Sequence, residues 1–254
     1  MTTPLPADAG RQAAHPSFAA LQARLRAGPL TRLVAFGSSN TERASHTMGA
    51  HNWFDWLDVG LQVTYGRVHH CINAGICGET SRHLLARFDR DVAFYQPHAV
   101  LITIGGNDSA PGHAMEEQEF RANLVELVRR VRSLPQALPI LQTYYSFDLE
   151  RIQPAHAARF TRDMEVVREV AAATGTALVD NLARWEVLRV QEPHAFRALM
   201  RDTMHVNPLG NLLWGLDLCR LFGAPISPIR VPEVAAGCTL QQHVDQRVAA
   251  SGAA

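Results

Sequence analysis

Residues 31–37 have the sequence TRLVAFG, a short, mostly apolar run that ends in glycine. Runs of this kind are typical of strands buried on both faces of a sheet. A similar run, AVLITIG, occupies 99–105, and EEQEFRANLVELVRRVRSL at 116–134 has the apolar spacing of an amphipathic helix. The acidic residues of this helix stand at its start, where the helix dipole favours negative charge. Buried strands that alternate with such helices predict a parallel sheet with helices on both faces.

The alternation of strand and helix repeats between residues 31 and 222. Strands are expected at 31–37, 67–73, 99–105, 138–145 and 176–181, and helices at 52–62, 81–95, 116–134, 155–174 and 208–222. Consecutive parallel strands need right-handed crossovers, so the predicted fold class is α/β, a three-layer α/β/α sandwich with a doubly wound, five-stranded parallel sheet. Residues 1–30, with a short helix over 18–26, are expected to form an N-terminal arm, and residues 223–254 a C-terminal arm rather than a second domain.

The composition suits an ordinary globular α/β protein and excludes several classes of partner. Of the 254 residues, 47% are hydrophobic and 19% are charged, and the formal net charge is zero. No overall field therefore attracts nucleic acid or acidic membranes. The apolar stretches are too short to span a bilayer, and residues 1–30 lack the apolar core of a signal peptide, so a cytoplasmic location is expected. The four cysteines show no metal-finger spacing, and free thiols are expected.

Small and polar residues follow the first three strands, at the edge where ligand sites lie in sheets of this type. Ser39 stands just after the first strand, Gly78 after the second and Asn107 after the third. Ser39 could act as a nucleophile at the opening of a helix, Gly78 could offer an unobstructed backbone N–H, and Asn107 could aim an amide donor across a pocket. Each also has a purely structural explanation, a helix cap for the serine and turn positions for the other two.

A further polar pair, Asp202 and His205, precedes the last helix, which Asn207 as N-cap and Pro208 as first residue are expected to begin. The spacing of three residues lets the carboxylate reach the imidazole, although a surface contact without chemistry would explain the pair by itself. Together, the strand ends and this pair supply a nucleophile, a backbone donor, an amide donor and an acid–base pair. These are the parts that an acyl-transfer site needs.

The motifs and their order resemble those of the GDSL/SGNH hydrolases over roughly residues 31–222. The most specific pieces are GGND at 105–108 and DTMHVN at 202–207. The resemblance implies a flavodoxin-like sandwich in which Ser39 attacks the substrate, His205 is the general base and Asp202 orients it. It also implies an oxyanion hole formed by the N–H groups of Ser39 and Gly78 and the side chain of Asn107.

One residue departs from the family pattern, because Ser38 stands where the family usually has an aspartate. That aspartate is not the triad acid, and its expected role is to form hydrogen bonds between neighbouring loops, which a serine hydroxyl can replace in part. The GxSxG elbow of the α/β-hydrolases is absent around Ser39, since Thr41 stands where the second glycine would be.

Other reactive or aromatic side chains have simpler explanations. Cys77 has no assigned base and is expected to be a small buried cysteine. His69 and His70 are adjacent in a strand and face opposite ways, and no HExxH motif occurs, so no metal site is expected. The aromatic residues expected in the core are Trp53, Trp56 and Trp214, and the candidate pocket walls are Tyr144, Tyr145 and Phe147.

The sequence therefore predicts an enzyme, a serine esterase that hydrolyses small acyl esters through an acyl-enzyme on Ser39. Acetylated carbohydrates are among the substrates that the resemblance implies, and thioesters and lysophospholipids stay open. A non-catalytic binding module of the same fold is the alternative from another class, and an acyltransferase is a second alternative. No cofactor is implied, the expected partner is a small-molecule ester, and the oligomeric state is not determined by the sequence.

Overall fold

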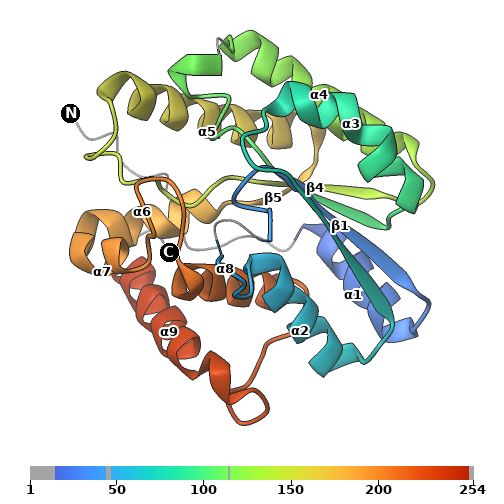
Figure 1. The fold of residues 1–254 in the computed structure, drawn as a ribbon. Helices are drawn as coiled ribbons and strands as arrows, with labels where there is room; N and C mark the ends of the chain where they lie inside the picture. Colours follow the sequence, from blue (N-terminus) through green and yellow to red (C-terminus); the bar gives the residue numbers. More distant parts are fainter. Residues whose placement is uncertain (1–14, 44–46, 114, 252–254) are drawn as a thin grey trace.

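The five strands form one parallel sheet in the order β2-β1-β3-β4-β5 (Figure 1). The structure is a computed structural model and describes residues 15–43, 47–113 and 115–251. The strands are β1 (Thr31–Gly37), β2 (His69–Gly75), β3 (Ala99–Thr103), β4 (Leu138–Gln142) and β5 (Ala177–Val179). From β1 the chain adds β2 on one side and then β3, β4 and β5 on the other. This is the doubly wound, flavodoxin-like order, so the predicted fold class is confirmed.

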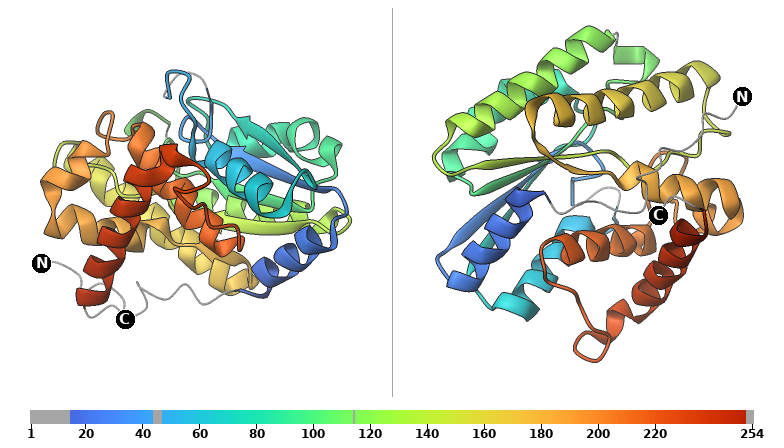
Figure 2. Two further views of the ribbon diagram at one scale, coloured as in Figure 1. Left: turned by 90° about the horizontal axis from the view of Figure 1, so that it is seen from below. Right: turned by 180° about the vertical axis from the view of Figure 1, so that it is seen from behind.

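Helices cover both faces of the sheet, which gives the three expected layers (Figures 1 and 2). One layer consists of α3 (Ser81–Asp91), α4 (Glu117–Ser133) and α5 (Pro154–Thr174). The opposite layer consists of α1 (Pro16–Ala27), α2 (Trp53–Tyr65) and α8 (Pro208–Leu221). Short 3-10 turns lie at Ala93–Tyr95, Pro111–His113 and Pro232–Val234.

Local sequence signals explain where the helices around the site begin. Asn52 caps α2 by accepting hydrogen bonds from two backbone N–H groups, and the Asp55 carboxylate accepts from the Asn52 N–H at 3.0 Å in return. Asn207 caps α8 in the same way, with Pro208 as the first helical residue, as the sequence predicts. These caps fix the starting points of the two helices that follow the nucleophile loop and the Asp202–His205 loop.

Three helices were not expected from the sequence. They are α6 (Asn181–Gln191), α7 (Pro193–Ala198) and α9 (Ala235–Ala250). The expected C-terminal arm, 223–254, therefore contains a helix that packs on the body of the protein, because α9 contacts α8 and α6. Gly237 permits this packing, since a Cβ there would lie 2.5 Å from the Leu212 side chain.

The core is built on the two central strands. Residues 33–36 of β1 and 99–102 of β3 are buried, which explains their continuous apolar sequence. Trp53 of α2 stacks on Trp214 of α8 with ring centroids 4.9 Å apart, so both are core residues as expected, whereas Trp56 is only partly buried.

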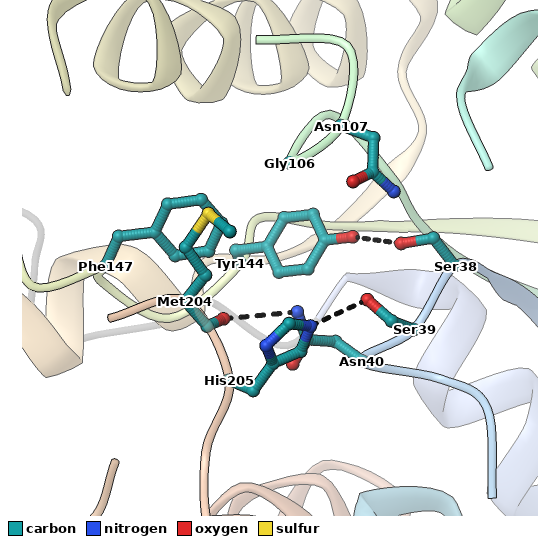
Figure 3. Close-up of a pocket in the computed structure, with 9 residues that line it drawn as sticks. All are labelled: Ser38, Ser39, Asn40, Gly106, Asn107, Tyr144, Phe147, Met204 and His205. Carbon is teal, nitrogen blue, oxygen red and sulfur yellow. Dashed lines mark hydrogen bonds between the residues drawn. The ribbon is translucent and has the colours of Figure 1, made fainter. Parts of the chain in front are cut away.

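The carboxyl ends of the parallel strands bring several loops together at one edge of the sheet. The loops after β1 and β2 approach each other closely at Gly75, where a Cβ would lie 2.3 Å from the backbone nitrogen of Glu42. Only glycine permits this approach. The loop before α8 brings His205 to the same edge, beside Ser39 (Figure 3).

Candidate active site

Ser39 lies two positions beyond β1, in a tight turn. The N–H groups of Thr41 and Glu42 both donate to the Ser38 carbonyl at 2.9 Å, which closes the turn. The Ser39 side chain lines the pocket, and its Oγ is 2.9 Å from Nε2 of His205 (Figure 3). The residue is only 6% exposed, so the hydroxyl is reached through the pocket rather than from open solvent.

His205 and Asp202 lie in a short loop between α7 and α8. An antiparallel bridge between Met200 and Val206 closes this loop, and the Arg201 N–H donates to the His205 carbonyl at 2.8 Å. The two carboxylate oxygens of Asp202 lie 3.0 and 2.9 Å from Nδ1 of His205. The structure therefore brings Ser39, His205 and Asp202 into one hydrogen-bonded chain.

The environment of Asp202 keeps its carboxylate charged. Partial burial opposes ionisation, but the N–H of Met204 and the neighbouring imidazole outweigh it, so the pKa of Asp202 lies below its usual value. A charged carboxylate accepts a hydrogen bond from the N–H group at Nδ1 and so leaves the lone pair on Nε2 directed at the Ser39 hydroxyl. In this arrangement His205 can take the serine proton.

Asn107 reaches the pocket from the loop after β3. Its Nδ2 donates to the Glu79 carbonyl at 2.8 Å, and a primary amide has a second N–H, which can serve the pocket that Asn107 lines. Gly78 is the other predicted donor outside the nucleophile loop. It does not line the pocket, and it precedes Glu79 in the turn after β2. Glycine suits this position because φ is +79°, although there is open space where a Cβ would lie.

The pocket is small, and polar side chains share its lining with the aromatic and apolar side chains of Tyr144, Phe147 and Met204. It encloses about 240 Å³ including its open mouth. Its lining residues are Ser38, Ser39, Asn40, Gly106, Asn107, Tyr144, Phe147, Met204 and His205 (Figure 3). Two of the three predicted wall residues therefore line it. The third, Tyr145, lies behind the wall.

Tyr145 and Asn40 help to hold the site together, a role that the sequence does not predict for either residue. The Tyr145 hydroxyl lies 2.7 Å from the Met204 carbonyl, accepts from the Val206 N–H at 3.1 Å and also contacts Asn40 Oδ1. The buried phenol therefore joins the nucleophile loop to the loop of His205. The adjacent tyrosines after the fourth strand were the available signal, but two of the Tyr145 partners are backbone atoms of a loop about sixty residues away, which the sequence does not indicate.

Ser38 bridges two loops, which is the role expected of it. Its Oγ lies 2.9 Å from the Tyr144 hydroxyl, and both residues are buried. Desolvation raises the pKa of Tyr144, so the phenol keeps its proton and can donate. The hydrogen bond braces the loop after β1 against the loop after β4.

The variant Ser38→Asp, which introduces the usual family residue, should retain activity within about tenfold, because the protonated phenol can donate to a carboxylate as it does to a hydroxyl. Steady-state kinetics with p-nitrophenyl acetate measure the effect. Tyr144→Phe, which removes the hydrogen bond that Ser38→Asp is expected to keep, serves as the matched control. A loss in Ser38→Asp as large as that of Ser39→Ala would show that Ser38 takes part in the chemistry.

In the described part of the chain, one cluster contains three side chains that could bind a metal ion. Their possible ligand atoms lie within 4.8 Å of one another, and the residues are Asp58, His69 and Cys71. His69 Nε2 lies 2.7 Å from Asp58 Oδ1. This is a direct hydrogen-bond distance, whereas two ligands of a tetrahedral zinc ion lie about 3.3 Å apart. Burial raises the pKa of the Cys71 thiol well above its usual value, so the thiol is protonated. We interpret the group as a hydrogen-bonded network between α2 and β2.

The expectation that Cys77 is buried was wrong, because the structure places it at the surface. The chain leaves the sheet after Gly75, and the turn that contains Gly78 carries Cys77 to the surface. The Cys77 thiol is not among the groups that line the pocket around Ser39.

A hydroxyl, an imidazole and a carboxylate in hydrogen-bonded sequence, at the carboxyl edge of a doubly wound sheet, are the features of a serine hydrolase. A family model agrees with this class, and the chain belongs to the GDSL-like lipase/acylhydrolase family, whose model matches residues 35–213. The match begins within β1, ends within α8 and contains each predicted site residue.

Several known proteins are similar to the chain over most of its length. An acetylxylan esterase of Geobacillus stearothermophilus is 28% identical over 78% of this chain and 97% of its own length. The solved structure of a variant of such an esterase from that organism has a TM-score of 0.66 and 26% identity, and the match covers 79% of this chain and 98% of the other. An α/β hydrolase from the metagenome of Lake Arreo, Spain, gives the same TM-score and identity over 78% of this chain and 97% of its own.

A further relative is described as an uncharacterized lipoprotein of Bacillus subtilis. It is 28% identical over 59% of this chain and 70% of its own length. Among the residues that the structure describes, no helix combines the length and the apolar character needed to cross a membrane.

Proposed function

We propose that the chain is a serine esterase that removes small acyl groups, acetyl above all, from carbohydrate hydroxyls through an acyl-enzyme on Ser39. The observation that carries the proposal is the continuous chain of hydrogen bonds from Ser39 through His205 to Asp202 at the wall of a small pocket. Structures of the Geobacillus acetylxylan esterase include catalytic mutants at a serine, an aspartate and a histidine. The last two lie three positions apart, as Asp202 and His205 do.

In the proposed reaction, His205 accepts the Ser39 proton as the hydroxyl attacks the carbonyl carbon. The tetrahedral intermediate collapses, His205 donates that proton to the departing alcohol oxygen, and the acyl group stays on Ser39. Water then repeats the sequence and releases the carboxylic acid. Asp202 keeps the imidazole in the tautomer that this proton transfer requires, and it stabilises the imidazolium that forms.

The pocket supports a short acyl group. Tyr144 and Phe147 line it, and Phe147 stacks on Phe160 with centroids 3.9 Å apart, so the aromatic wall cannot easily yield. The space between these walls, with its open mouth included, is about 240 Å³. An acetyl group fits such a site, and a long acyl chain would need Phe147 or Met204 to move.

The rates of hydrolysis of esters with acyl groups of increasing length test the proposal. We expect hydrolysis of p-nitrophenyl acetate and of acetylated xylo-oligosaccharides, with kcat/KM falling steeply from acetate to butyrate to octanoate. Ser39→Ala is the control for background hydrolysis. Higher activity on octanoate would contradict the short acyl pocket, and binding of the oligosaccharide without turnover would indicate a binding module.

The cytoplasmic location stays a prediction, since one relative is described as a lipoprotein.

Asn107→Ala should reduce kcat by about 10²–10³ with little change in KM, because an oxyanion donor contributes mainly when the carbonyl oxygen becomes negative. Kinetics and a thermal melting curve on one preparation separate this effect from loss of folded protein. The matched control is Asn123→Ala. Asn123 donates to the hydroxyl of Ser81 at 2.9 Å, just after the loop that contains Glu79, but it does not line the pocket. An unchanged kcat in folded Asn107→Ala would remove the amide from the mechanism.

A further inference from the structure

A buried arginine lies directly beneath the two loops that carry the proposed nucleophile and oxyanion donors. Arg87 projects from α3, and its side chain is only 6% exposed. The guanidinium stands 4.5 Å from the centroid of the Phe36 ring in β1. A charge so buried is stable only where hydrogen bonds and opposite charges compensate for lost hydration. The positions of those partners are therefore informative.

The partners of Arg87 come from three segments around the site. One terminal nitrogen, Nη2, donates to the carbonyl of Gly37 at 2.9 Å, two positions before the proposed nucleophile. The other, Nη1, donates at 2.8 Å both to the carbonyl of Ala74, near the end of β2, and to Asp91. Nε donates to the Glu79 carboxylate at 2.5 Å.

Glu79 connects this cluster to the proposed oxyanion hole. Its carboxylate pairs with Arg87, and its backbone carbonyl accepts from the Asn107 side chain at 2.8 Å. Glu79 also directly follows Gly78 in the chain. A continuous set of contacts therefore runs from the end of β1, through the guanidinium and Glu79, to Asn107.

We infer that Arg87 is a positioning residue, which fixes the loop of Ser39 relative to the loop of Gly78 and Glu79 and so sets the distance between nucleophile and oxyanion donors. The inference rests on the proposed function. Arginine suits this role because its planar group has five N–H donors in fixed directions and can hold two carbonyls and two carboxylates at once. A lysine ammonium has three donors and cannot reach all four partners together.

The test compares Arg87→Lys with a matched buried arginine outside the site. We expect kcat of Arg87→Lys for p-nitrophenyl acetate to fall about 10²-fold with little change in KM, since displacing reacting groups by about 1 Å costs that much. The control is Arg184→Lys. Arg184 pairs with Asp217 and Asp245 and donates to the Gln241 carbonyl, away from the pocket. It should lose thermal stability and retain kcat per folded molecule.

A folded Arg87→Lys with unchanged kcat would overturn the inference, and so would an equal loss of kcat in Arg184→Lys. If Arg87→Lys does not fold, Glu79→Gln carries the same test, because it removes the charged partner of Arg87 that lies in the loop of Gly78 and keeps the carbonyl that holds Asn107. If the wild-type protein hydrolyses no ester, the proposed function fails, and amide hydrogen exchange then decides on Arg87 alone. Faster exchange in both loops, 38–42 and 76–81, only in the Arg87 variant would support positioning, and unchanged exchange would exclude it.

Discussion

Replacing Ser39 by alanine should lower kcat for p-nitrophenyl acetate by roughly 10⁶, the scale of loss when a triad serine is removed. The reason is that the variant has no hydroxyl at the point where His205 Nε2 is directed, 2.9 Å from Ser39 Oγ. The pocket and the donors remain, so substrate binding should change little. Steady-state kinetics on a preparation with an unchanged melting temperature measure this effect.

Covalent labelling gives the complementary result. An organophosphonate should modify Ser39 alone, because only a hydroxyl next to a base attacks phosphorus readily. Ser38→Ala is the matched control, since Ser38 is the neighbouring serine, lines the same pocket and has a tyrosine hydroxyl rather than an imidazole as its partner. That variant should still be labelled at Ser39. Modification at Ser38 or at the exposed Cys77 would contradict the assignment.

The central layer of the fold could be predicted from the sequence because its strands are buried on both faces. The predicted first strand, 31–37, has the bounds of β1, and the helix predicted at 116–134 differs from α4 by one residue at each end. Burial on both sides requires apolar residues at nearly every position, which is a strong local signal. The fourth predicted strand was too long, since the chain leaves the sheet after Gln142 and its two tyrosines turn toward the site.

The peripheral helices could not be predicted in this way. Helix α9 buries Val244 and Val248 together with Gly237 and Gln241, so small and polar residues occupy part of its buried face. Its partners are α8 and α6. Because part of the face that meets them is not apolar, the apolar periodicity that would indicate a packed helix is weak. For this reason the sequence predicted a C-terminal arm at 223–254, a range that contains the packed helix α9.

The site shows the same division. Ser39, Asp202 and His205 could be proposed because each has a reactive side chain at a strand end or a helix start. Arg87 could not, because two of its partners are backbone carbonyls, and carbonyls belong to every residue type. A helical arginine is also expected on the surface, where most arginines lie. Only the packing of α3 against the ends of β1 and β2 distinguishes it.

Replacing Asp202 by asparagine should lower kcat by about 10⁴, the loss expected when a triad histidine is held in the wrong tautomer. The structure indicates how this would occur. Asp202 Oδ1 accepts from the N–H groups of both Met204 and His205 at 2.8 Å, so the amide oxygen of asparagine would occupy this position. Its NH₂ group would then face Nδ1 of His205, which would have to accept, and the proton would move to Nε2, where it blocks uptake of the serine proton.

Asp202→Ala is the informative comparison, because it removes the carboxylate without offering a competing donor to Nδ1. The Asp202 side chain is 47% exposed, so water can reach the vacated position and support the productive tautomer. We therefore expect Asp202→Ala to lose less activity than Asp202→Asn, although it also loses two hydrogen bonds of its loop and should melt at a lower temperature. NMR of the His205 ring nitrogens reports the tautomer directly. If the alanine variant is instead the less active one while both remain folded, the hydrogen bonds that the side chain at 202 accepts from Met204 and His205, which asparagine can keep and alanine cannot, matter more than the tautomer.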